Sequence, residues 1–297
     1  MAKDRTRTRS RIAAAVQADP RRFLSLVALV LALVVSAVAA SVPGSMAKFS
    51  VAVTNSTNSA KAAASNSCAW TYATGTPTPY FLYPLNENPV SSSVLVNDVT
   101  ANKRHGTYTG TPVHSGSNGC VRDLDGSTTF NGTNTLLVSP TQQASPQTFS
   151  VEIWFKTTGQ GYLIGLNNSK TGAGSTYDRH LYINSANKLV FGVYNGTTNT
   201  VVSAASVNDG LWHHAVGTFV STGGMYLYLD GQSVGTPITS AITAETNNGW
   251  WRIGYGNIGS WPNQPANFYF NGQLAYAAVY TSVLPAATVS AHYSAGV

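Results

Sequence analysis

Residues 210–231 read GLWHHAVGTFVSTGGMYLYLDG, and this stretch decides the fold class. Within it, residues 225–230 (MYLYLD) alternate between aliphatic side chains and aromatic or acidic ones. A period of two puts alternate side chains on opposite faces, which is typical of a β-strand with one face in a hydrophobic core. Asp209-Gly210 and Asp230-Gly231 flank these segments, and such pairs supply the positive φ angles of tight hairpins. The stretch therefore predicts antiparallel strands.

The same pattern extends from Tyr80 to Tyr280. In residues 150–156 (SVEIWFK), Val, Ile and Phe again share one face. Short β-rich runs are separated by further turn pairs: Asn118-Gly119, Asp125-Gly126, Asn131-Gly132, Asn195-Gly196, Asn248-Gly249 and Asn271-Gly272. We therefore expect an all-β fold, a two-sheet antiparallel sandwich, which excludes a parallel α/β architecture. Only Pro285–Tyr293 looks helical, as a short C-terminal helix with Pro in its first turn.

The net charge of +6 comes almost entirely from the start of the chain. Residues 1–22 carry seven basic and two acidic groups, and the other 275 residues carry ten basic and nine acidic groups. The body therefore lacks the basic footprint of a nucleic-acid-binding protein. We expect residues 1–22 to stay on the cytoplasmic side of a membrane.

Residues 23–42 (FLSLVALVLALVVSAVAASV) contain no charge and are long enough, as a helix, to span a bilayer. The run ends in small residues that a signal peptidase would cut after Ala39 or Ala40. Two roles therefore stay open: a cleaved signal peptide, or an uncleaved transmembrane anchor. In either case residues 43–297 are predicted to lie outside the cell, either secreted or held at the cell surface.

Residues 43–79 are rich in Ala, Ser, Thr and Asn and show little periodicity, so we expect a linker or stalk there and a folded domain over residues 80–297. Cys68 and Cys120 are the only cysteines. In an exported protein we expect them to form a disulfide; the alternative is two buried thiols.

The order of short motifs after residue 80 resembles the laminin-G-like jelly-roll family of the concanavalin A-like lectin and glucanase superfamily. The motifs are Tyr83-Pro84-Leu85-Asn86-Glu87, His105-Gly106-Thr107, Phe130-Asn131-Gly132, residues 149–155 (FSVEIWF), Gly210-Leu211-Trp212-His213-His214, residues 226–231, Arg252-Ile253-Gly254 and residues 270–274 (FNGQL). The resemblance implies a jelly roll and, in some relatives, a calcium ion. Asp98 and Asn102 are the nearest match for its ligands. Many relatives carry an acidic pair where this chain has Ala275-Tyr276.

A retaining glycosidase on this scaffold needs two carboxylates about 5 Å apart. The glutamates are Glu87, Glu152 and Glu245, and Trp154 stands where a partner of Glu152 would be required. We therefore predict no catalytic residues. His213 and His214 are consecutive strand residues that point to opposite faces, so we expect packing roles and no shared metal.

The best candidate for a ligand site is an aromatic and amide-rich stretch that contains Trp250, Trp251, Tyr255, Trp261 and Asn263. Sugars bind where aromatic plates lie beside hydrogen-bonding side chains; the competing interpretation is that these rings fill the core. Asp178 and Arg179 follow a Gly-rich loop, where they would either clamp a ligand or form a surface ion pair.

The sequence thus predicts a non-catalytic, exported or surface-bound protein that binds a glycan, needs no cofactor other than a candidate calcium ion, and contacts the membrane only if residues 23–42 are retained. A structural or adhesive module that contacts proteins is the alternative. A glycoside hydrolase is disfavoured by the missing carboxylate pair.

Overall fold

The computed structural model describes residues 54–55, 58–59, 68–88, 90–92, 94–123 and 125–297. The predictions for residues 1–22 and 23–42 lie outside this part of the chain. Among the described residues, no helix is both long and apolar enough to cross a membrane. The chain divides into two units, Met1–Ala63 and Ala64–Val297. In the first unit, β1 (Thr54–Asn55) and β2 (Asn58–Ser59) pair in antiparallel fashion.

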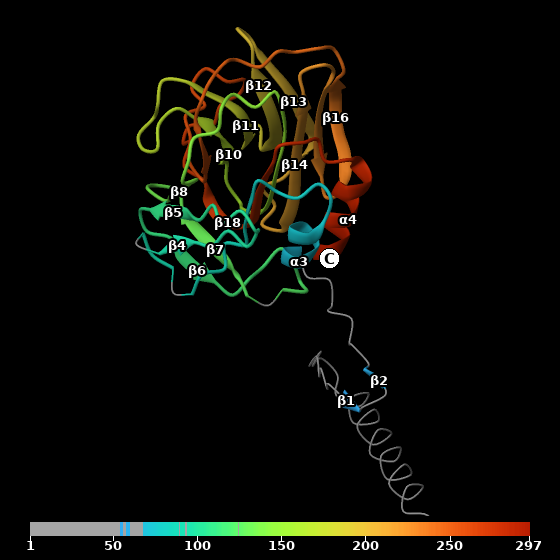
Figure 1. The fold of residues 1–297 in the computed structure, drawn as a ribbon. Helices are drawn as coiled ribbons and strands as arrows, with labels where there is room; N and C mark the ends of the chain where they lie inside the picture. The colour runs from blue at the N-terminus through green and yellow to red at the C-terminus, as the bar shows by residue number, and fades with distance from the viewer. Residues whose placement is uncertain (1–53, 56–57, 60–67, 89, 93, 124) are drawn as a thin grey trace, which may run out of the picture. The chain divides into compact units, whose positions relative to one another are not determined.

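The second unit is a sandwich of two antiparallel sheets, as the sequence predicts (Figure 1). The front sheet runs in the order β13 (Thr198–Ser206), β12 (Lys188–Tyr194), β11 (Tyr177–Ile183), β10 (Gly161–Asn167), β17 (Trp250–Ile253), β8 (Leu136–Val138), β5 (Gly106–Thr109) and β4 (Leu95–Val96). The back sheet runs in the order β16 (Gln232–Ile238), β15 (Gly224–Leu229), β14 (Trp212–Val220), β9 (Thr148–Lys156), β18 (Asn271–Tyr280), β7 (Ser127–Asn131) and β6 (Val113–Ser115), with β3 (Phe81–Tyr83) paired to β18.

The predicted alternation sets the core. In β9, Val151, Ile153 and Phe155 lie in the cluster between the sheets, and Trp154 belongs to a second cluster on the outer face of the back sheet. Strand β14 pairs with β9 without a break from Trp212–Lys156 to Val220–Thr148. A one-residue slip would turn every apolar side chain outward, so burial of one face fixes this register.

Two helices cover the second cluster: α3 (Cys68–Thr74) and α4 (Ala286–Gly296), which contact each other and lie side by side in Figure 1. The predicted C-terminal helix is confirmed. Helix α3 corrects the prediction that residues 43–79 are only a linker, because Cys68 and Tyr72, one turn apart, are fully buried against the sandwich. The predicted disulfide between Cys68 and Cys120 is present, with 6.2 Å between the Cα atoms.

Candidate functional site

The outer face of the front sheet is partly covered by the loop of residues 254–269. Hydrogen bonds fix this loop: the Tyr182 hydroxyl donates to the Pro262 carbonyl at 2.8 Å, and the Tyr162 amide donates to the Phe268 carbonyl at 3.0 Å. Trp261 is the loop's main contact and is only 4% exposed. Its ring lies against Gly192 of β12 so closely that a side chain there has no room. Trp261 therefore covers the outer face of the front sheet at β12.

Beside Trp261, at the end of β11 and β12, lies a pocket of about 310 Å³. Its lining combines three aromatic residues, a carboxylate and several hydroxyl groups: Tyr177, Tyr194, Trp261, Glu245, Ser175, Thr176, Thr198 and Ser260. Tyr177 and Tyr194 are half-buried, so each presents part of a ring to solvent. The Tyr177 hydroxyl donates to the Gly259 carbonyl at 3.1 Å, which holds that ring against the loop.

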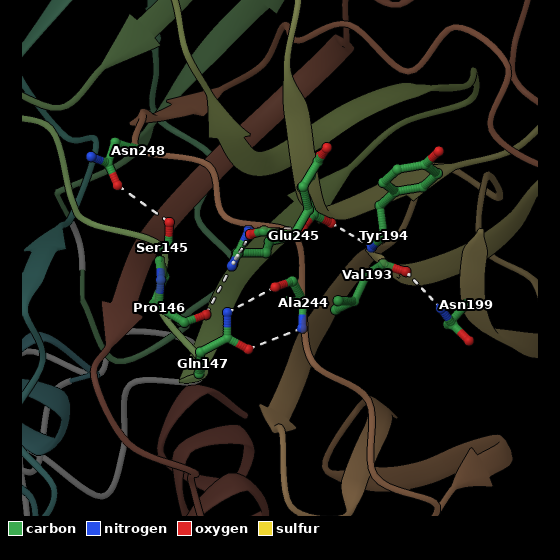
Figure 2. Close-up of polar contacts among 11 residues, drawn as sticks. Ser145, Pro146, Gln147, Val193, Tyr194, Asn199, Ala244, Glu245 and Asn248 are labelled. Carbon is green, nitrogen blue, oxygen red and sulfur yellow. Dashed lines mark hydrogen bonds and ion pairs between the residues drawn. The ribbon is translucent and has the colours of Figure 1, made fainter. Parts of the chain in front are cut away.

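Glu245 is brought to the pocket by a clamp on the neighbouring loop. Gln147 exchanges two 2.9 Å hydrogen bonds with the backbone of Ala244. The Glu245 amide donates to the Tyr194 carbonyl at 2.8 Å. Figure 2 shows the side chains of Glu245 and Tyr194 pointing to the same side, away from Gln147. No described residue donates a hydrogen bond to the Glu245 carboxylate, so its oxygens are available to a ligand.

Asp178 and Arg179 form a buried ion pair under the pocket, with 2.8 Å between Nη1 of Arg179 and Oδ2 of Asp178. Arg179 also donates to the carbonyls of Pro146 and Glu245, and Asp178 accepts from the Tyr194 amide. Both side chains are fully buried. The ion pair that the sequence offered as one alternative is therefore present, but it is buried and not at the surface, and it holds the pocket wall from below.

The same burial affects the ionisable groups under the pocket. Burial raises the pKa of Asp178 to about 6, although Arg179 and two backbone amides favour its charged form. Burial, together with Arg179, lowers the pKa of His180 to about 3, so its ring is neutral at pH 7. The neutral His180 ring packs edge to face on Trp261, with 4.7 Å between the ring centroids.

The structure separates the predicted aromatic stretch. Trp251 lies in the core between the sheets and cannot meet a ligand, which corrects its assignment. Trp250, on the opposite face of β17, is half-buried with the Lys170 ammonium 5.5 Å from its ring. Tyr255 stacks on Tyr269 at a centroid distance of 3.8 Å.

Of the remaining predicted residues, Trp261 lines the pocket. Asn263 is exposed on the loop, and its carbonyl accepts a 2.8 Å hydrogen bond from the Ser185 amide.

Sequence reasoning did not select Tyr194, Thr198 or Glu245. A signal existed for the first two, because they flank the turn at Asn195-Gly196 and so come together at one end of a hairpin.

The residues proposed for calcium do not fit a cation site. The Asp98 carboxylate accepts four hydrogen bonds, from the amides of Leu82, Thr100 and Arg104 and from the Thr100 hydroxyl. The Asn102 amide nitrogen donates to the carbonyls of Pro79 and Tyr80. Both side chains therefore fix the loop after β4, and the Asp98 oxygens that would bind an ion already accept hydrogen bonds within the protein.

Glu152 lies on the back sheet beneath the two helices, away from the pocket. It accepts hydrogen bonds from His214, His292 and the Tyr280 hydroxyl at 2.7–3.1 Å. Burial alone would raise the pKa of Glu152, but the charge of His292 and the bonds from both histidines lower it well below its ordinary value. His213 and His214 point to opposite faces as predicted; His213 contacts Asp230 at 2.8 Å.

Comparison with known proteins identifies the family of this chain. Residues 130–290 match the family model described as the concanavalin A-like lectin/glucanases superfamily. The chain belongs to this superfamily, which confirms the resemblance in the sequence. No curated protein matches the sequence.

Solved structures show the same fold at low identity. Domain 4 of AbnA, a GH43 extracellular arabinanase from Geobacillus stearothermophilus solved in complex with arabinotriose, is 17% identical, with a TM-score of 0.50 over 72% of this chain and 98% of that one. The binding domain of botulinum neurotoxin DC, solved with rat synaptotagmin II and also with SialylT, is 11% identical, with a TM-score of 0.51 over 73% of this chain. This chain spans about half (51%) of those toxin chains.

Proposed function

We propose that this protein is a non-catalytic, exported or surface-bound carbohydrate-binding protein whose binding site is the pocket beside Trp261. One observation carries the proposal. The Glu245 carboxylate, which accepts no hydrogen bond from a described residue, lies in a pocket of about 310 Å³ beside the partly exposed rings of Tyr177 and Tyr194.

The chemistry of this lining suits a sugar. A sugar ring has apolar C–H faces and a rim of hydroxyl groups, so it favours an aromatic surface beside hydrogen-bonding groups. Tyr177 and Tyr194 offer the surface, and Glu245 and Thr198 offer the acceptors and a donor. The buried Asp178–Arg179 pair holds the backbones of Tyr194 and Glu245 in place before a ligand arrives, which lowers the entropic cost of binding.

The similar structures support this ligand class at the level of fold. The arabinanase domain was solved with arabinotriose, and the toxin domain was solved with a protein as well. Protein contact therefore stays the alternative to be separated by experiment. Fold alone does not choose between them.

A non-catalytic role is supported by the placement of the carboxylates. Among the described residues that line the pocket, Glu245 is the one acid. Glu152 lies under α3 and α4 with its oxygens bonded to two histidines and a tyrosine. A glycosidase pair about 5 Å apart is therefore missing from the pocket lining.

Export is supported by the disulfide between Cys68 and Cys120, because such bonds persist in oxidising compartments. The uncharged run at residues 23–42 would direct export, either as a cleaved signal or as an anchor. Mass spectrometry of the mature N-terminus separates the two: a chain that starts near residue 40 was cleaved, and a chain that retains residues 23–42 is anchored.

The binding proposal is tested by retention of the full chain on columns of immobilised polysaccharides, neutral and acidic, with calcium and with a chelator. We expect selective retention on one class of polymer, unchanged by the chelator because the oxygens of Asp98 are already bonded within the protein. Passage through every column would contradict the proposal and make protein contact the leading account.

A further inference from the structure

Two hollows lie at the end of the sandwich where β12 begins, opposite the end of β12 that carries the pocket. One, of about 320 Å³, is lined by Gln160, Asn187, Asn267 and Tyr269 together with Thr158 and Asn271. The other, of about 260 Å³, is lined by Thr129, Lys156 and Gln273 together with the same Thr158 and Asn271. Because the two hollows share these residues, we treat them as one feature, the rim groove.

The rim groove is separate from the pocket. Asn187 precedes β12 at the groove, and Tyr194 ends β12 at the pocket. A strand of seven residues is about 20 Å long at 3.3 Å per residue. The two places therefore lie on one chain at opposite ends of the same strand.

Side-chain amides dominate the rim groove, and those of Gln160, Asn187 and Gln273 keep unused hydrogen-bonding atoms. Nε2 of Gln160 donates to Oδ1 of Asn187 at 2.8 Å, which leaves Oε1 of Gln160 and Nδ2 of Asn187 without a partner among the described residues. Oε1 of Gln273 is buried without a partner among them as well. A buried polar atom that is left unpaired costs free energy, so such an atom favours a partner from solvent or ligand.

Gln273 also has a fixed place in the sheet. On β18 it pairs with Lys156 of β9 on one side and with Thr129 of β7 on the other. Three polar side chains therefore form a row across neighbouring strands of the back sheet, and Asn271 and Thr158 line the same hollow. An amide both donates and accepts, and a hydroxyl does the same, which matches the hydroxyl groups of a neutral sugar.

An aromatic surface borders the amides. Tyr269 stacks on Tyr255 with the rings 10° from parallel, and Asn267 fixes its backbone through a 3.0 Å hydrogen bond. The Asn267 side chain is itself bonded to the Gly132 carbonyl at 2.6 Å. The groove thus places a rigid ring beside side-chain amides, the two elements that a sugar chain needs.

We propose that the rim groove is a second binding site, for a neutral polysaccharide chain, and that the protein is bivalent. This inference rests on the proposed function, because it takes sugar as the ligand of both sites. Among the described residues that line the groove, Lys156 is the one with a charge, and the amides outnumber it, so a neutral chain fits better than an acidic one. Two linked sites bind a polymer more tightly than either alone.

The test uses the full chain on columns of arabinan, xylan, cellulose, chitin and, as the acidic polymer, polygalacturonate. Tyr269→Ala and Asn271→Ala together remove the groove, and Tyr194→Ala with Glu245→Gln removes the pocket. Tyr226→Ala and Gln142→Ala serve as matched controls, because neither residue lines the pocket or the groove. Circular dichroism confirms that each variant is folded.

We expect each site variant to reduce retention on a neutral polymer at least tenfold, and the combined variant to lose it. If the wild-type chain is retained and the groove variant elutes with it, the second site is overturned while the pocket stands. Retention on polygalacturonate alone would overturn the proposal that the ligand is a neutral polysaccharide. Failure of the wild-type chain on every column would overturn both proposals.

Discussion

The amide nitrogen of Glu245 donates a 2.8 Å hydrogen bond to the carbonyl oxygen of Tyr194. This bond joins the loop before β17 to the end of β12 and places a free carboxylate beside a partly exposed ring (Figure 2). Arg179 supports the bond from below through the Glu245 carbonyl, and Asp178 supports it through the Tyr194 amide. The pocket wall therefore depends on groups that never touch a ligand.

Replacing Arg179 tests this support. Arg179→Met leaves the Asp178 carboxylate buried without its partner, and we expect a loss of about 3 kcal/mol in the free energy of unfolding. Urea denaturation measures it. Arg122→Met, at an exposed position, is the matched control and should change little. The double variant Asp178→Asn/Arg179→Met should recover part of the loss, and equal loss in the single and double variants would contradict this account.

The buried carboxylate under the helices predicts a pH dependence. The pKa of Glu152 is lowered in the folded chain, so its contribution to stability is present above the unfolded value of about 4.3 and is lost as the pH falls below it. Glu152→Gln removes the charge that His214 and His292 face, and we expect a loss of about 3 kcal/mol near pH 7. Thermal denaturation between pH 3 and 7 should show a flatter profile for the variant. If the melting temperature of Glu152→Gln fell with pH as steeply as that of the wild-type chain, the lowered pKa of Glu152 would be contradicted.

Reduction of the disulfide should destabilise the domain. Cys68 and Cys120 are 52 residues apart, and closing a loop of that length contributes about 4 kcal/mol in the chain-entropy model. The bond also fastens α3, which carries Tyr72 to the Trp154 indole at 2.8 Å. A Cys68→Ala/Cys120→Ala variant should melt at a clearly lower temperature than the oxidised chain. Equal melting temperatures would mean that packing alone holds α3.

Sequence patterns predicted the sandwich because strand alternation is local. The period of two in residues 150–156 and 225–230 places the same side chains in the core that the structure buries. Alternation also explains why Trp250 and Trp251 separate, since neighbours on β17 face opposite sides. The helix at Cys68–Thr74 was missed because its stability comes from a disulfide and from packing on a distant sheet.

The site was harder to predict because loops assemble it. Glu245 lies in a segment without periodicity. Contacts with residues distant in the sequence bring it to Tyr194: Gln147 binds the backbone of Ala244, 97 residues further along the chain, and Arg179 binds the Glu245 carbonyl. Arg179 has a positive φ of 59°, which interrupts the alternation of β11. A regular strand would have put Asp178 and Arg179 on opposite faces, and the interruption lets them form the buried pair.

The most direct test of the central claim is calorimetric titration of the full chain with a soluble oligosaccharide from the polymer that retains it, repeated with Tyr194→Ala and Glu245→Gln. We expect each variant to weaken binding at the pocket by about 1–2 kcal/mol, roughly tenfold, with an unchanged melting temperature. Tyr226→Ala should bind like the wild-type chain. Wild-type affinity in both pocket variants would show that the sugar binds elsewhere and would contradict the account.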